Sequence, residues 1–237
     1  MRSFTDNDAA RESQLRKMFL QAGCADADLT EERFQRKDPP NIICTLRGSS
    51  DSAIIVGAHT DHAEVGRGVV DDWSGAALLP ALLESLRKSP RRHTFAFIGF
   101  ADEEKGMLGS HYYVQHLSRE QVHGIRAVVN LECLGLTPTK VWADRADRQL
   151  LSDLTLIAMN YQLDLQGVNV DAVGDDDTHP FLSRHAPVIT IHSVTQETWP
   201  ILHSPRDKLS AINLKDYYAS YCLIAAYLAY LDTTLPQ

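Results

Sequence analysis

The chain has 237 residues, of which 44% are hydrophobic and 23% are charged, as is ordinary for one large globular domain or two small ones. Its net charge of −8 argues against a nucleic-acid partner, since such binding relies on an excess of Lys and Arg. No apolar run is long enough for a transmembrane helix, so we expect no membrane partner. The N-terminus has no apolar core of a signal peptide, which points to the cytoplasm, although an exported protein whose signal had been removed would look the same.

The pattern of apolar residues predicts strands that alternate with helices. We expect helices at residues 8–22, 76–87, 107–117, 148–161 and 214–231. We expect strands at residues 33–35, 41–46, 52–57, 93–100, 125–131, 141–143 and 187–191. Because no repeat or linker interrupts this alternation, we predict one α/β domain over residues 1–237 with a mostly parallel central sheet.

The four cysteines lie far apart in the sequence and form no Cys-x-x-Cys motif. They are Cys24, Cys44, Cys133 and Cys222. This spacing favours free thiols in the core over a disulfide framework.

Two adjacent carboxylates, Glu103 and Glu104, follow the apolar run 95–98. Open α/β sheets place their sites at the carboxyl ends of the strands, where this pair would lie. Adjacent side chains point in different directions, so one glutamate could bind a metal while the other faces a water molecule. The simpler alternative for a Glu-Glu pair is a solvated acidic loop.

Further histidines and carboxylates follow other predicted strands or lie in the loops after them. The full set is His59, Asp61, Asp71, Glu103, Glu104, Glu132 and His203. Each has a simple structural explanation by itself; Asp71 and Asp72, for example, would make a good helix N-cap pair. Together they offer imidazole and carboxylate ligands without a thiolate, which suits catalytic zinc. About five ligands suffice for two metals when one carboxylate bridges them.

The motifs around these residues resemble those of the co-catalytic dizinc aminopeptidases, kin to bacterial leucyl aminopeptidases, glutamate carboxypeptidase II and glutaminyl cyclases. The similar segments are His59-Thr60-Asp61, Asp71-Asp72-Trp73-Ser74-Gly75, Glu103-Glu104-Lys105-Gly106-Met107-Leu108-Gly109-Ser110, Asn130-Leu131-Glu132-Cys133 and His203-Ser204-Pro205-Arg206-Asp207. They occur in the family's order along nearly the whole chain. The resemblance implies a three-layer αβα domain of the zinc-dependent exopeptidase type, with a mixed, mostly parallel sheet.

The resemblance also implies a role for each matching residue. His59 and Glu132 would hold one zinc ion, His203 and Glu104 would hold a second, and Asp71 would bridge the two. Glu103 would be the general base for a water bridging the metals, and Asp61 would orient His59. The implied activity is that of a zinc-dependent exopeptidase, an aminopeptidase in the first place, acting on peptides with a free terminus. With no obvious insertion for dimerisation, we expect a monomer.

Two departures from the family pattern concern the site. Glu132 stands where Asp is commoner, which puts the geometry of that metal in doubt. Residues 177–181 resemble a family loop that usually reads Asp-His-x-Pro-Phe, so a pocket residue is altered. The acids Asp175, Asp176 and Asp177 are expected in a solvated loop, with the α-ammonium of a substrate as their alternative partner. Four other histidines are left out of the ligand set, namely His62, His111, His179 and His192.

Two other functions stay open. A glutaminyl cyclase-like aminoacyltransferase would use the same fold with a single zinc ion. A binding protein on a peptidase scaffold would keep its fold after metal removal and would show no turnover.

Overall fold

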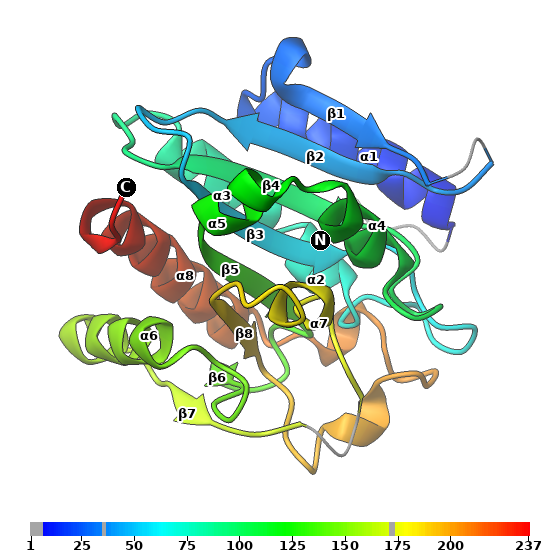
Figure 1. The fold of residues 1–237 in the computed structure, drawn as a ribbon. Helices are drawn as coiled ribbons and strands as arrows, with labels where there is room; N and C mark the ends of the chain where they lie inside the picture. Colours follow the sequence, from blue (N-terminus) through cyan, green and yellow to red (C-terminus); the bar gives the residue numbers. More distant parts are fainter. Residues whose placement is uncertain (1–6, 35–36, 171–173) are drawn as a thin grey trace.

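A computed structural model describes residues 7–34, 37–170 and 174–237 of the chain. It has one eight-stranded sheet with the order β1-β2-β4-β3-β5-β8-β6-β7 (Figure 1). The strands are β1 Leu29–Glu32, β2 Asn41–Leu46, β3 Ala53–His59, β4 Thr94–Phe100, β5 Ile125–Glu132, β6 Lys140–Val141, β7 Gln166–Gly167 and β8 Val188–His192. The central strands β4, β3, β5 and β8 are parallel, while β1, β2 and β6 pair antiparallel with their neighbours toward the sheet centre. The predicted α/β fold with a mixed, mostly parallel sheet is therefore confirmed.

Within the described residues, eight α-helices connect or flank these strands. They are α1 Asp8–Ala22, α2 Trp73–Ala76, α3 Leu79–Leu86, α4 Leu108–His116, α5 Arg119–Gly124, α6 Arg148–Tyr161, α7 His179–Leu182 and α8 Leu214–Thr234. Short 3-10 helices occupy Asp26–Asp28, Trp199–Ile201 and Leu209–Ala211. No helix in the described ranges combines the length and the apolar character needed to cross a bilayer.

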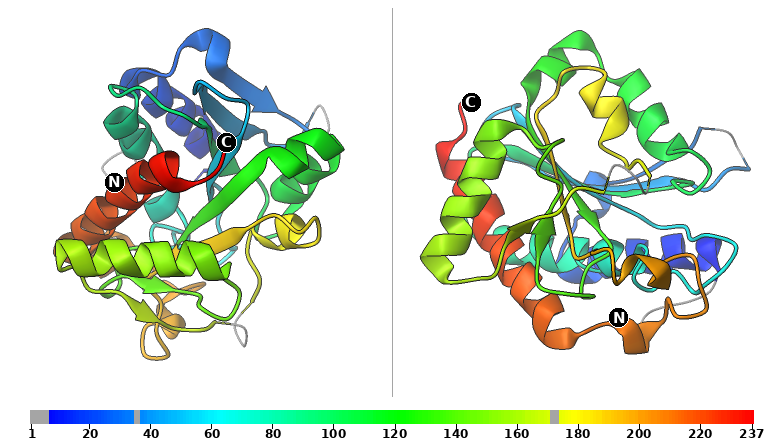
Figure 2. Two further views of the ribbon diagram at one scale, coloured as in Figure 1. Left: turned by 60° about the vertical axis from the view of Figure 1, so that its left-hand side comes forward. Right: turned by 90° about the horizontal axis from the view of Figure 1, so that it is seen from below.

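The helices form two layers because strand side chains alternate between the faces of the sheet. Ile54 and Val56 on β3 pack with the apolar residues of α1, α3, α6 and α8. Ile55, between them, packs on the other face with Val114 of α4 and Phe181 of α7. Figure 2 shows α4, α5 and α7 on one side of the sheet and α1, α3, α6 and α8 on the other. This is the expected three-layer arrangement.

Most predicted elements lie close to the observed ones, two differ, and the short elements α5, α7 and β7 were not predicted. The strand expected at residues 33–35 is wrong at residues 33 and 34, while residue 35 lies outside the described residues; the strand is β1, which pairs with β2 from Leu29↔Cys44 to Glu32↔Asn41. The helix expected at residues 76–87 is two helices, α2 and α3, with Pro80 in the first turn of α3. Proline has no backbone N–H, so it starts a helix more easily than it continues one. The unpredicted helix α5 begins with a capping box between Ser118 and Gln121.

The expectation of four free cysteines is wrong. Helix α1 ends at Gly23, whose φ of 98° is left-handed, and the chain then turns back toward the sheet. Cys24 thereby reaches Cys44 in β2, and the two form a disulfide. Their meeting depends on how α1 packs against β2, which sequence spacing does not show. Cys133 and Cys222 are free thiols.

Candidate active site

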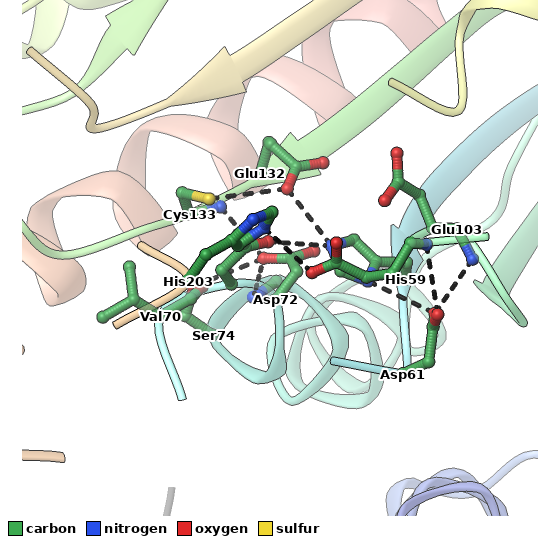
Figure 3. Close-up of polar contacts among 12 residues, drawn as sticks. His59, Asp61, Val70, Asp72, Ser74, Glu103, Glu132, Cys133 and His203 are labelled. Carbon is green, nitrogen blue, oxygen red and sulfur yellow. Dashed lines mark hydrogen bonds and ion pairs between the residues drawn. The ribbon is translucent and has the colours of Figure 1, made fainter. Parts of the chain in front are cut away.

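Three neighbouring parallel strands bring the predicted site residues to one edge of the sheet. His59 is the last residue of β3 and Glu132 the last of β5, while Glu103 and Glu104 follow β4. Because β3 pairs in parallel with both β4 and β5, the carboxyl ends of the three strands lie together. Loops from elsewhere in the chain add Asp71 and His203, which contact each other. Figure 3 shows His203 next to the residues that end the strands.

The carboxylate of Asp71 lies between two pairs of side chains. Its Oδ1 is 3.0 Å from Nε2 of His59, and that nitrogen is 3.4 Å from Oε1 of Glu132. Its Oδ2 is 3.0 Å from Nε2 of His203, and that nitrogen is 3.1 Å from Oε1 of Glu104. Each oxygen of Asp71 therefore faces one histidine and, beyond it, one glutamate. We call these the β5 half-site (His59, Asp71, Glu132) and the β4 half-site (His203, Asp71, Glu104).

The neighbouring Asp72 has a different environment. It is fully buried, and its Oδ1 accepts hydrogen bonds from the backbone N–H groups of Gly75, at 3.1 Å, and Cys133, at 3.0 Å. It thereby caps α2 and ties this helix to the chain after β5. A Cβ on Gly75 would lie 2.5 Å from Oδ2 of Asp72, so this close cap requires glycine.

Asp61 holds the backbone of the glutamate pair. Its two oxygens accept hydrogen bonds from the N–H groups of Glu103 and Glu104, at 3.0 and 3.1 Å, and its Oδ1 lies 3.4 Å from Nδ1 of His59. Burial would raise the pKa of Asp61, but His59 and these N–H groups outweigh burial and lower it. Asp61 is thus ionised and faces the ring nitrogen of His59 that points away from Asp71.

Two residues that support the site were given no role from the sequence. Asp207, 1% exposed, accepts hydrogen bonds from the N–H groups of Val69, Val70 and Asp71 at 2.9, 2.7 and 3.3 Å. The signal in the sequence that could have identified Asp207 was its place at the end of the His-Ser-Pro-Arg-Asp motif. The guanidinium of Arg11 is fully buried and donates to the carbonyl oxygens of residues 60, 61 and 67. No motif marks Arg11.

Without a cation nearby, negative charge on these crowded and buried carboxylates is unfavourable. Burial raises the pKa of Glu103 to about 10, and negative neighbours, Asp71 and Glu132 among them, act in the same direction. Burial also raises the pKa of Glu132, against the attraction of His59. The pKa of His203 rises to about 10 because its Nε2 lies beside the carboxylates of Asp71 and Glu104, which stabilise the protonated ring. The site therefore concentrates negative charge that positive partners stabilise.

The residues fit a pair of metal ions. Asp71, Glu104 and His203 offer ligand atoms that all lie within 4.8 Å of one another. Oε1 of Glu104 is buried and accepts no hydrogen bond, although Nε2 of His203 lies 3.1 Å away. Nitrogen and carboxylate donors of this kind suit zinc in a catalytic site. An unpartnered buried oxygen in a cluster of ligands is what a bound cation would satisfy.

A cavity of about 300 Å³ opens beside these residues. Its apolar wall is formed by Met107, Trp142, Val194, Trp199 and Leu202. Six of its described lining residues are Asp or Glu, and none of them is Lys or Arg. The cavity therefore combines an apolar surface with an acidic end.

The acidic loop beside this cavity is not the solvated loop expected from the sequence. Asp176 and Asp177 are buried, and Asp175 pairs with Arg145 and His179. Asp176 accepts hydrogen bonds from its neighbours in the fold, among them Thr190 of β8. Asp176 is buried where it contacts β8, whereas Asp175 stays exposed beside Arg145, and the run of charges in the sequence does not reveal these contacts. The start of the loop, residues 171–173, lies outside the described residues.

The four histidines left out of the ligand set lie outside the metal-holding groups found among the described residues. His62 pairs with Asp8, and His179 pairs with Asp175. His192 bonds to the backbone on both ring nitrogens and lines the cavity. The ring of His111 contacts that of His179.

The chain is similar to known aminopeptidases and to a glutaminyl cyclase. A probable leucine aminopeptidase 2 of Aspergillus oryzae is 28% identical over 118 residues, which are 49% of this chain and 24% of that protein. The chain thus aligns with about a quarter of the length of this curated relative. The solved structure of BSAP, a zinc aminopeptidase from Bacillus subtilis, superposes with a TM-score of 0.75 at 23% identity, covering 83% of this chain and 51% of that one. A glutaminyl cyclase from an Acidobacteriales bacterium superposes with a TM-score of 0.78 at 19% identity, covering 94% of this chain and 86% of that one.

The two solved structures establish the fold. The family follows from a model of Peptidase family M28, which matches residues 41–228 and so includes every residue of the two half-sites. The chain belongs to Peptidase family M28.

Proposed function

We propose that this protein is a zinc-dependent aminopeptidase that holds two metal ions per chain. The observation that carries the proposal is the position of Asp71, whose two oxygens face two separate His and Glu pairs. One carboxylate between two such pairs is the arrangement that a bridged two-metal site needs. The family and its aminopeptidase relatives support the same activity.

The residues around the metals would act as follows. Two zinc ions bound there would polarise the scissile carbonyl, activate a water molecule and, by their charge, lower the pKa of Glu103. The carboxylate of Glu103 would then accept a proton from that water and deliver it to the nitrogen of the leaving amine. Asp61 would accept the Nδ1–H of His59 and so keep Nε2 free to bind metal.

The lining of the cavity favours a substrate with a free amino terminus. The described lining has acidic side chains and no Lys or Arg, so it favours an ammonium group over a terminal carboxylate. The apolar wall, including Trp142 and Leu202, would accommodate an apolar first side chain. We therefore expect leucyl and similar substrates to be preferred over acidic ones.

The test compares metal content and hydrolysis of a panel of aminoacyl-anilides for the wild type and Glu103→Gln. We expect two zinc ions in both proteins and a fall of about 10²–10⁴-fold in kcat for the variant, the contribution typical of a general base. A matched panel of carboxyl-terminal substrates should stay uncleaved. Full activity of the variant would show that Glu103 is not the base.

The same experiment separates the alternatives. A single zinc ion, no anilide hydrolysis and conversion of N-terminal glutamine would make the protein a glutaminyl cyclase. Absence of bound metal together with absence of turnover would indicate a binding protein on this scaffold.

A further inference from the structure

Cys133 is a free thiol that lies inside the proposed metal centre. Its sulfur is 3.5 Å from Oε1 of Glu132, the oxygen that also lies 3.4 Å from Nε2 of His59. Ligand atoms of Asp71, Glu132 and Cys133 all lie within 4.8 Å of one another. Figure 3 shows the sulfur directed at the Glu132 carboxylate from the side of Asp72. The side chain is buried, and the residue borders the cavity.

The backbone fixes this sulfur in place. Cys133 has a left-handed φ of 50°, its N–H donates to Asp72, and its carbonyl oxygen accepts a hydrogen bond from the hydroxyl of Ser193. Glu132 is held as well, because the amide of Asn130 donates to its Oε2 and leaves Oε1 facing His59 and the sulfur. The thiol position is therefore built into the fold.

The distances match the edges of one coordination tetrahedron. Zinc binds oxygen and nitrogen at about 2.0 Å and sulfur at about 2.3 Å, so tetrahedral geometry separates O from S by about 3.5 Å and N from O by about 3.3 Å. The Sγ–Oε1 distance of 3.5 Å and the Nε2–Oε1 distance of 3.4 Å agree with these values. Oδ2 of Asp72 is buried and has no hydrogen-bond partner, so it leaves an unsatisfied acceptor beside the same half-site.

We propose that Cys133 is a thiolate ligand of the metal in the β5 half-site, alongside His59, Asp71 and Glu132. The inference rests on the proposed function only in requiring a metal at this centre. On coordination the S–H bond breaks, the electron pair stays on sulfur and forms the bond to the metal, and the proton leaves to water. The β5 half-site would then have four protein ligands, whereas the β4 half-site has three, with only nitrogen and oxygen donors, and would keep the open position for water.

The test uses Co²⁺ as a spectroscopic probe. The metal-free full-length protein is titrated with Co²⁺ while its near-ultraviolet and visible spectra are recorded. We expect a sulfur-to-cobalt charge-transfer band in the wild type, and the same band in Cys222→Ser, which removes the other free thiol. In Cys133→Ser the band should vanish while the visible cobalt bands remain. One of the two cobalt equivalents should then bind at least about tenfold more weakly, the loss typical of disturbing a metal's ligand support.

Each outcome bears on the proposal. Cobalt binding by the wild type without a charge-transfer band would overturn the thiolate ligand and leave the aminopeptidase proposal intact. A band that persists in Cys133→Ser would overturn it too, and failure to bind cobalt at all would overturn both proposals. The absence of a band from the wild-type spectrum would be decisive without any variant, and thermal melting would reveal a variant that misfolds. A band without anilide hydrolysis would support the ligand and contradict the proposed function.

Discussion

We expect the buried side chain of His192 to make the stability of the folded protein depend on pH. It is the last residue of β8 and is 1% exposed. Its Nε2 donates to the carbonyl oxygen of Val168 at 2.9 Å, and its Nδ1 accepts from the N–H of Val194 at 3.2 Å. Only the neutral imidazole can make both bonds, since the protonated ring has no acceptor. Burial accordingly lowers the pKa of His192 to about 4.

The sign and size of the effect follow from that pKa. The unfolded chain protonates His192 near pH 6.5, well before the folded protein does, so acid favours unfolding. The stability that the neutral ring contributes is present above about pH 6.5 and is lost as the pH falls toward about 4. Each pKa unit corresponds to about 1.4 kcal/mol, so the full loss is about 3 kcal/mol, of which about 2 kcal/mol is lost by about pH 5.

Urea unfolding at about pH 7.5 and about pH 5 measures this loss. The variants His192→Gln and His192→Asn do not titrate in this range, and each has an amide that can keep one of the two hydrogen bonds. Both should be less stable than the wild type at pH 7.5, yet their free energies of unfolding should fall by about 2 kcal/mol less between the two pH values. The comparison cancels the other titrating groups. Equal falls in all three proteins would refute a buried neutral His192.

Three further predictions concern the metal centre and the fold. Glu104→Gln should bind one metal ion instead of two, as measured by metal analysis, because an amide is a poorer ligand than a carboxylate; unchanged content would contradict the β4 half-site. Arg11→Met should lower the free energy of unfolding in urea by about 3 kcal/mol, because three carbonyl oxygens lose a charged donor; a change below about 1 kcal/mol would mean that water replaces it. Leu228→Ala, in the buried face of α8, should cost about 2–5 kcal/mol in the same assay while metal content stays that of the wild type.

Much of the fold was predictable because its signals are local. Helices α1 and α6 have the predicted bounds because the signals for each helix lie in or next to its own segment: the Asn7 cap and the Gly23 stop flank α1, and the Asp147 cap precedes α6. The short strand β1 was placed wrongly, because its register depends on β2 across a turn. Sequence periodicity carries little information about a four-residue edge strand.

The site was predictable to the extent that its residues follow strands. His59 and Glu132 end parallel neighbours, so their approach follows from the sheet alone. The Cys24–Cys44 disulfide and the burial of Asp176 were not predictable, because both depend on contacts between segments distant in sequence. The role of Arg11 was not predictable for the same reason, since its hydrogen-bond partners lie 49 or more positions away in the sequence.

The backbone around the proposed metal centre is held mainly by carboxylates outside the predicted ligand set. Asp61, Asp72 and Asp207 each accept hydrogen bonds from at least two backbone N–H groups next to or within the segments that carry ligands. Such bonds exist whether or not a metal is bound, so the backbone holds the ligand positions before loading. A site arranged in advance loses less conformational entropy when it binds metal. The acidic residues of these motifs therefore fall into two groups. Some face the proposed metal centre, and the others hold the backbone of the segments that carry its ligands.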